Sequence, residues 1–119
     1  MKRFLIRTLI TAAAIFLVVK LMPQEWMRAE SPLTLIIAAL LLGLLNSILR
    51  PILIILTLPF TVLTLGLFIL VINGFILYLV HLIDPSFYIL NFWVAMLASL
   101  LISIVASLIY WLIKDNASA

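Results

Sequence analysis

Long apolar stretches dominate the chain, and short polar intervals separate them. A helix needs about 20 apolar residues to cross a hydrocarbon core of about 30 Å. Two such stretches stand near the ends of the chain, at residues 4–22 and 92–113. A third, residues 33–83, holds a single charged residue, Arg50, and is long enough for two crossings. The pattern therefore predicts an all-α, polytopic integral membrane protein with four transmembrane helices.

Two prolines divide the long central stretch. Pro51 has no backbone N–H and its ring clashes with the carbonyl of Ser47, and Pro59 acts in the same way one short segment later. The helix pattern is therefore expected to fail between them. The helices are predicted over residues 4–22, 33–49, 60–82 and 92–113, within a single transmembrane domain over residues 1–119.

The Pro-broken segment, residues 50–59, is apolar, unlike a loop in water. Irregular backbone exposed to hydrocarbon is costly, so such a segment must be buried in protein or lie at the membrane interface. Two models satisfy this condition. Either helix two continues past a kink at Pro51, or residues 51–58 form a short helix that lies flat on the membrane or dips into it. We favour the second model.

The first apolar stretch has a competing interpretation as a cleaved signal peptide. A cleavage site needs small residues after the apolar run. The residues that follow Lys20 read Leu-Met-Pro-Gln-Glu-Trp-Met and are poorly suited to cleavage. Lys20 itself does not prevent a crossing, because long basic side chains near helix ends reach the interface. We therefore predict an uncleaved helix.

Composition supports a membrane protein, since 68% of the residues are hydrophobic and 9% are charged. Soluble domains have about 45–50% apolar and about 25% charged residues. The chain contains no cysteine, which excludes disulfides, thiolate metal sites and a cysteine nucleophile.

The distribution of Lys and Arg predicts the orientation. Cytoplasmic ends of membrane helices carry an excess of these residues. With four crossings, one side carries Lys2, Arg3, Arg7, Arg50 and Lys114, and the other carries Lys20 and Arg28. We expect a multi-pass protein of the bacterial cytoplasmic membrane with both termini in the cytoplasm.

Three polar residues lie within the apolar central stretch. Arg50 either marks the cytoplasmic end of helix two and reaches lipid phosphate, or serves a functional site inside the membrane. Asn46 and Asn73 either hydrogen-bond between helices or line a polar path for an ion or headgroup.

Small residues recur every fourth position in two helices, which places them on one face of each. Such stripes allow close helix approach, within one chain or between copies, and the serines are also compatible with a wet pore. The stripes are Ala39, Gly43 and Ser47, and Ala95, Ser99, Ser103 and Ser107. Around Pro59, threonine hydroxyls are expected to bond freed carbonyls, and Gly66 and Gly74 are expected to admit a neighbouring helix.

The sequence contains few residues of the types that carry out catalysis. His81 is the single histidine, near Asp84 at a helix end, where an interfacial cap is its expected role. No Gly-rich phosphate loop, metal-ligand cluster or serine–histidine–acid set is present, so we expect neither an enzyme nor a cofactor. No basic patch beyond the N-terminal charges points to nucleic acid.

The central stretch carries a recognisable pattern. Asn46-Ser-Ile-Leu-Arg50-Pro51 is followed by Leu-Thr-Leu-Pro59, Leu-Thr-Leu-Gly66-Leu-Phe and Ile-Asn73. The pattern resembles the YvlD-like membrane proteins, the four-helix mycobacterial phage holin superfamily. The resemblance implies a small bacterial membrane protein with four spans.

Three functional hypotheses remain open. The first is a non-enzymatic role in the envelope for a protein that self-associates into a homo-oligomer among membrane lipids. The alternatives are a holin-like pore or channel, which no continuous polar helix face supports, and lipid-headgroup binding through Arg50. The residues expected to matter, in function or in building the central hairpin, are Asn46, Arg50, Pro51, Pro59, Gly66 and Asn73.

Overall fold

The computed structural model describes residues 2–118, and for residues 115–118 it describes the backbone alone. In chain order the elements are α1 (Lys2–Leu21), β1 (Met27–Ala29), α2 (Pro32–Leu56), α3 (Leu58–Leu63), α4 (Phe68–Ile83), β2 (Phe87–Ile89) and α5 (Phe92–Ser118). Three helices, α1, α2 and α5, are long and apolar enough to cross a membrane, and α4 is a shorter apolar helix. The described chain is mostly helical, as predicted.

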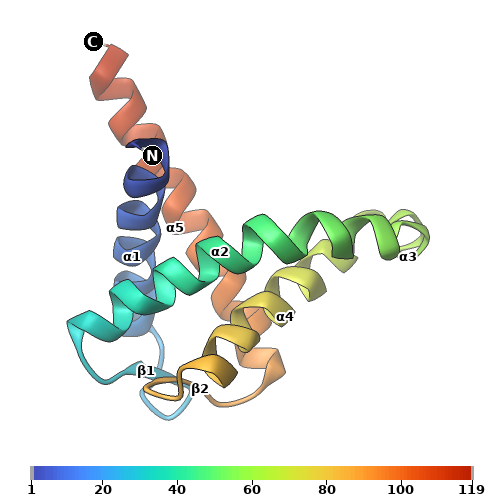
Figure 1. The fold of residues 1–119 in the computed structure, drawn as a ribbon, viewed down its shortest axis with the longest axis horizontal. Coiled ribbons are helices and arrows are strands. Elements are labelled where there is room, and N and C mark those ends of the chain that lie inside the picture. Colours follow the sequence, from blue (N-terminus) through green and yellow to red (C-terminus); the bar gives the residue numbers. More distant parts are fainter. Residues whose placement is uncertain (1, 119) are drawn as a thin grey trace.

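The four long helices form a ring of contacts around a common core. α1 packs against α5 and α2, and α4 packs against the same two helices from the other side. Both termini lie at one end of the molecule, and β1 and β2 lie at the opposite end (Figure 1). Completely buried side chains from all four helices fill the ring, among them Ala14, Ile15, Val18, Ala38, Ile76, Leu77, Val80, Ala95 and Ala98.

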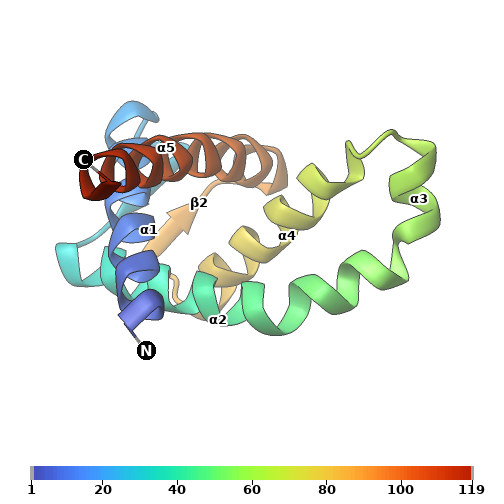
Figure 2. The ribbon, with the colours of Figure 1, turned by 90° about the horizontal axis from the view of Figure 1, so that it is seen from above.

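α2 and α4 extend beyond this ring as an arm that ends in α3. Figure 1 shows α2 running across α1 instead of along it. Figure 2 shows α3 at the far end of the arm, away from α1 and α5. The arm is therefore surrounded by protein near its base and by open space at its tip.

A two-stranded antiparallel sheet joins the two connections at the end opposite the termini. It pairs Met27 with Ile89 and Ala29 with Phe87. The side chains of Met27, Phe87 and Ile89 are buried and close the core at that end. The sequence prediction did not include this sheet, because strands of three residues are too short to show a period in the pattern.

The predicted end of helix two at residue 49 is wrong, because α2 continues through Pro51 to Leu56. The favoured model of a separate helix over residues 51–58 is therefore also wrong, and the continued helix is correct. Pro51 removes one intrahelical hydrogen bond without ending the helix. The helix ends instead at Leu56, where the amide and the hydroxyl of Thr57 both donate to the carbonyl of Leu53, at 3.0 and 2.6 Å.

The predicted third helix, residues 60–82, is divided in two. α2 ends at Leu56 and α3 begins at Leu58, so one break falls at Thr57, within the predicted segment 50–59. A second break separates Leu63 of α3 from Phe68 of α4. Pro59 stands in the first turn of α3, where a missing N–H costs nothing. The turn between the helices uses positive φ angles at Leu65 and Gly66.

Candidate functional site: an arginine cleft between α1 and α2

Three arginines line one cleft of about 340 Å³ between α1 and α2. Arg3 and Arg7 stand one turn apart on α1, and Arg50 reaches the cleft from α2. Hydroxyl and amide groups complete the polar part of the lining, and the full set is Arg3, Phe4, Arg7, Thr8, Thr11, Ala39, Leu42, Gly43, Asn46, Ser47 and Arg50. We call this site the arginine cleft.

The first small-residue stripe creates the space for the cleft. Ala39, Gly43 and Ser47 all line it, so the stripe faces α1 of the same chain. A Cβ added at Gly43 would lie 3.7 Å from Cε2 of Phe4, which is ordinary contact. The stripe therefore leaves a hollow between the helices in addition to letting them approach.

A small inner cavity lies on the other side of Arg50 and Asn46. It measures about 50 Å³ and is also lined by Asn73 of α4 and Ser99 of α5. A polar cavity needs about 10–15 Å³ of such volume to hold one water, so water fits among these polar side chains. The structure thus brings together Asn46, Arg50 and Asn73, which the sequence singled out separately.

A third hollow, between α1 and α5, holds about 600 Å³ and shares Arg3 and Arg7 with the arginine cleft. Lys114 and Tyr110 of α5 line its far wall. Arg3, Arg7, Arg50 and Lys114 therefore line these two hollows, and Lys2 at the start of α1 adds a fifth basic residue at the end that carries the termini.

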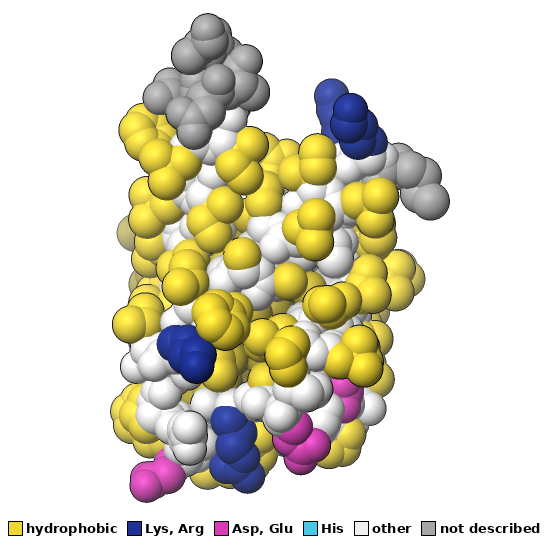
Figure 3. Space-filling model, turned by 90° about the vertical axis from the view of Figure 1, so that its left-hand side faces the viewer, with side chains coloured by type: hydrophobic (Ala, Val, Ile, Leu, Met, Phe, Trp, Pro, Cys, Tyr) yellow, Lys and Arg dark blue, Asp and Glu magenta, His cyan; other side chains and the backbone are white. Residues whose placement is uncertain are grey.

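Acidic side chains lie elsewhere among the described residues. None of the three cavities is lined by a described Asp or Glu side chain. On the face drawn in Figure 3, Asp and Glu appear only at the end with the strands, and a hydrophobic band separates that end from the termini. The positive charge of the arginine cleft is therefore not neutralised by a described acid, and an anion is the ligand that its chemistry favours. Guanidinium groups bind phosphate through two parallel hydrogen bonds, which fixes its orientation as well as its charge.

The remaining predicted residues lie in the arm. Pro51 is exposed on α2 next to Arg50, and Pro59 begins α3. Gly66 has a φ of 91° and no neighbour within 4 Å of an added Cβ, so it serves the turn and admits no helix, contrary to expectation. Gly74 does fulfil that role, because an added Cβ would lie 2.5 Å from Cγ of Met96.

The second small-residue stripe changes its environment along α5. Ala95 and Ser99 are buried against the bundle, and the Ser99 hydroxyl donates to the carbonyl of Met96 at 2.9 Å. Ser103 and Ser107 are exposed and line a shallow hollow. Ser103 also lines the small cavity beside Arg50 and Asn73, and Ser107 also lines the hollow between α1 and α5. The second half of the stripe is therefore exposed but still borders cavities of its own chain.

His81 serves the strand end of the fold. Its Nδ1 lies 2.8 Å from the carbonyl oxygen of Phe87 and 3.3 Å from the amide of Ile89. The rings of Tyr78 and Tyr88 flank it. The histidine thus ties α4 to β2, and among the described residues no group of acids, cysteines or histidines is arranged to hold a metal.

Sequence reasoning missed Arg3 and Arg7 as members of the site. Both were interpreted as topology signals at the start of a helix. Their spacing of four, continued by Thr11, places them on one face of α1, and that was the available signal. Which helix this face meets depends on the packing order of the helices, which spacing alone does not give.

Comparisons with known proteins place the chain among small membrane proteins. The family model described as "Mycobacterial 4 TMS phage holin, superfamily IV" matches residues 2–108. The "Uncharacterized protein SCO3922" of Streptomyces coelicolor is 40% identical over 114 residues, covering 89% of this chain and 91% of that protein. The "Uncharacterized membrane protein YvlD" of Bacillus subtilis is 46% identical over 70 residues, covering 58% of this chain and 59% of that protein. No solved structure matches.

Proposed function

We propose that the chain, which belongs to the mycobacterial 4 TMS phage holin family, superfamily IV, acts as a multi-pass protein of the bacterial inner membrane. We also propose that it binds anionic lipid. The phosphate of the lipid headgroup occupies the arginine cleft, and the role is non-enzymatic. The observation that carries this proposal is the convergence of Arg3, Arg7 and Arg50 on one cleft without a described acidic partner.

The charge distribution supports a cleft that opens into the cytoplasmic leaflet. The end of the bundle with the termini carries the five basic residues Lys2, Arg3, Arg7, Arg50 and Lys114. The strand end carries two, Lys20 and Arg28, together with the acidic residues Glu25, Glu30 and Asp84. By the positive-inside rule, both termini then face the cytoplasm. Anionic lipids give that leaflet a negative surface potential, so the ligand is abundant where the cleft opens.

The lining of the cleft suits a phosphodiester headgroup. Its volume of about 340 Å³ lies at the lower end of the range for small-ligand sites. The hydroxyls of Thr8, Thr11 and Ser47 offer hydrogen bonds around the arginines, and Phe4 and Leu42 offer an apolar wall for the first carbons of the acyl chains. The lining contains no Asp, Glu, His or Cys, so the cleft supplies binding groups without a general base.

Native mass spectrometry from nanodiscs tests the proposal. The nanodiscs would contain equal parts phosphatidylglycerol and phosphatidylcholine, and lipid retained on the ejected protein would be counted. Wild type should retain phosphatidylglycerol in a fixed ratio, and Arg50→Gln should lose it. The matched control is Arg28→Gln, because Arg28 lies at the strand end with its guanidinium 4.1 Å from the centre of the Tyr88 ring.

The control variant should retain the lipid as wild type does. Equal retention by Arg50→Gln and wild type would overturn the proposal. So would retention of the two lipids by wild type in proportion to their abundance.

A self-associating, holin-like assembly is the second candidate. The exposed part of the α5 stripe, Ser103 and Ser107, favours it, because small residues on an outer face let a second helix approach. Copies joined through α5 would form a homo-oligomer, and a pore would require many of them. Cross-linking of Ser107→Cys in membranes, together with dye release from liposomes, tests this candidate, and Leu100→Cys on another exposed part of α5 provides the control.

A further inference from the structure

The tip of the arm is a turn made almost entirely of apolar residues. We call residues 57–67 the apex, which contains α3 and the turn that follows it. No Asp, Glu, Lys or Arg occurs from residue 51 to residue 83. In the apex, Leu63 is 80% exposed, Leu65 is 94% exposed and Leu67 is 72% exposed. A turn with these side chains is poorly suited to water.

The amide groups of the turn are paired within the protein. Every amide from residue 64 to residue 70 donates a hydrogen bond within the segment. Those of Leu65, Gly66 and Leu67 reach the oxygens of Val62, Thr61 and Thr64 at 3.2, 2.8 and 3.2 Å. The others are Thr64 N to Phe60 O at 3.0 Å, Phe68 N to Thr64 Oγ1 at 3.1 Å, Ile69 N to Gly66 O at 3.1 Å and Leu70 N to Leu67 O at 3.0 Å. Hydrocarbon demands this internal pairing, whereas water-exposed loops leave many amides to the solvent.

The polar side chains of the apex point back to its own backbone. The hydroxyls of Thr57, Thr61 and Thr64 donate to the carbonyls four residues earlier, at 2.6, 3.1 and 3.0 Å. Each threonine therefore adds a bond to a carbonyl near the ends of α2 and α3. The apex thus presents methyl groups and leucines to its surroundings.

The backbone conformation of Leu65 is independent evidence that the apex lies in hydrocarbon. Its φ of 57° lies in the left-handed region, where a Cβ is strained and where Asn or Gly is the usual choice. A leucine that combines this conformation with an exposed fraction of 94% gains nothing in water. In hydrocarbon, a polar side chain such as Asn at this position would have to be desolvated. Leucine avoids that cost, which is larger than the backbone strain it introduces.

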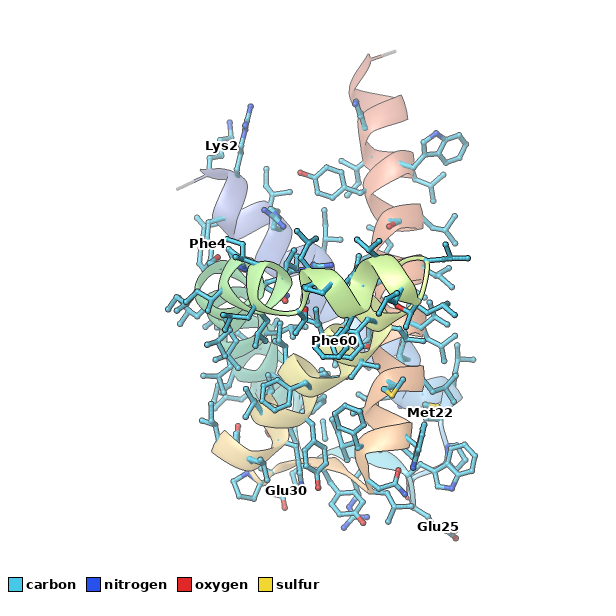
Figure 4. The ribbon with its side chains drawn as sticks, turned by 90° about the vertical axis from the view of Figure 1, so that its right-hand side faces the viewer. Lys2, Phe4, Met22, Glu25, Glu30 and Phe60 are labelled. Atoms are coloured by element: carbon cyan, nitrogen blue, oxygen red, sulfur yellow. The ribbon has the colours of Figure 1, made fainter. Side chains whose placement is uncertain are left out.

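The dimensions of the arm agree with a turn inside the membrane. α4 has 16 residues, which corresponds to about 24 Å at about 1.5 Å per residue, less than a core of about 30 Å. α2 is longer but runs across α1 (Figure 1), so only part of its length spans the thickness of the membrane that α1 crosses. Figure 4 shows Phe60 of α3 between Lys2 at one end of the molecule and Glu25 and Glu30 at the other.

We propose that the arm is a re-entrant hairpin whose apex lies among the acyl chains of the cytoplasmic leaflet. The arm enters from the strand side, and its apex does not emerge into the cytoplasm. The occupant of this surface is lipid hydrocarbon. In this arrangement α1 and α5 are the helices that cross completely, in contrast to the four spans named in the description of the family. The proposal rests on the orientation given under the proposed function but not on a lipid in the arginine cleft.

The absence of cysteine from the natural chain makes the test direct. Leu65→Cys would carry a nitroxide label in bilayers, and its collision rates with oxygen and with a nickel chelate would be measured. Oxygen concentrates in hydrocarbon and the chelate in water. The apex label should show high oxygen and low chelate access. Lys2→Cys and Glu25→Cys, at the two ends of the molecule, are the water-exposed controls.

Leu63→Cys repeats the measurement at a position in α3, outside the left-handed turn, so a folding defect specific to position 65 does not decide the outcome. High chelate access at both apex positions would overturn the proposal in favour of a cytoplasmic loop. Low access of both reagents would overturn it in favour of a second copy of the chain that covers the apex.

Discussion

The contact between α4 and α5 at Gly74 determines how the arm joins the bundle. A Cβ added at Gly74 would lie 2.5 Å from Cγ of Met96, 2.9 Å from its Cα and 3.1 Å from its N. The Met96 side chain can rotate away, but its backbone cannot move without displacing α5. Gly74→Ala is therefore expected to push the two helices apart.

The magnitude follows from two opposing terms. Overpacking costs about 1–3 kcal/mol, and replacing glycine by alanine within a helix contributes about 0.5–1 kcal/mol of stability. Because backbone atoms are among the clashing atoms at Gly74, the clash should dominate, with a net loss of about 1–2 kcal/mol. Since 1 kcal/mol moves the Tm of a small domain by about 4–8 °C, a drop of about 5–10 °C is expected.

Gly43→Ala is the matched control, because its Cβ would make only an ordinary contact of 3.7 Å with Phe4. Its Tm should stay the same or rise. The assay is thermal unfolding in mild detergent, followed by tryptophan fluorescence. A Gly74→Ala protein at least as stable as wild type would refute the close approach of α4 and α5.

Three further predictions follow from the described contacts. Arg50→Lys should retain less phosphatidylglycerol than wild type in native mass spectra, because an ammonium cannot form the two parallel hydrogen bonds of a guanidinium. Equal retention would show that the positive charge alone holds the lipid. Thr64→Val should destabilise the protein by about 1–3 kcal/mol in reversible unfolding, because the Phe68 amide loses its partner at 3.1 Å, whereas Thr64→Ser should stay near wild type. Ser31→Ala should cost about 1 kcal/mol, because the Ser31 hydroxyl accepts from the Thr34 amide at the start of α2, and an unchanged midpoint would contradict that role.

The pattern of apolar stretches was sufficient to predict a helical membrane protein, because hydrocarbon imposes a length and a polarity that the sequence must display. The ends of the central helices were not predictable in the same way. The rule that proline ends a helix fails at Pro51, because α2 continues through it with the loss of one intrahelical hydrogen bond. The break between α3 and α4 depends on Leu65 and Gly66, and the strained leucine there could not be inferred from local preference.

The candidate site was predicted as separate residues and not as a group. Asn46, Arg50 and Asn73 were each conspicuous because polar side chains are rare in apolar stretches. That Asn73 faces the other two follows from the packing of α4 against α2, and that Arg3 and Arg7 join Arg50 follows from the packing of α1 against the small-residue face of α2. Helix order and rotation are properties of the whole fold, so sequence spacing identified the faces without identifying their partners.

A crystal structure grown in a lipid mesophase doped with phosphatidylglycerol would test the arginine cleft most directly. We expect a lipid phosphate within hydrogen-bonding distance of the Arg50 guanidinium and of Arg3 or Arg7, with the acyl chains leaving the cleft toward the bilayer. A cleft without lipid, in which Arg50 forms an ion pair with a carboxylate of the protein, would contradict the proposed function.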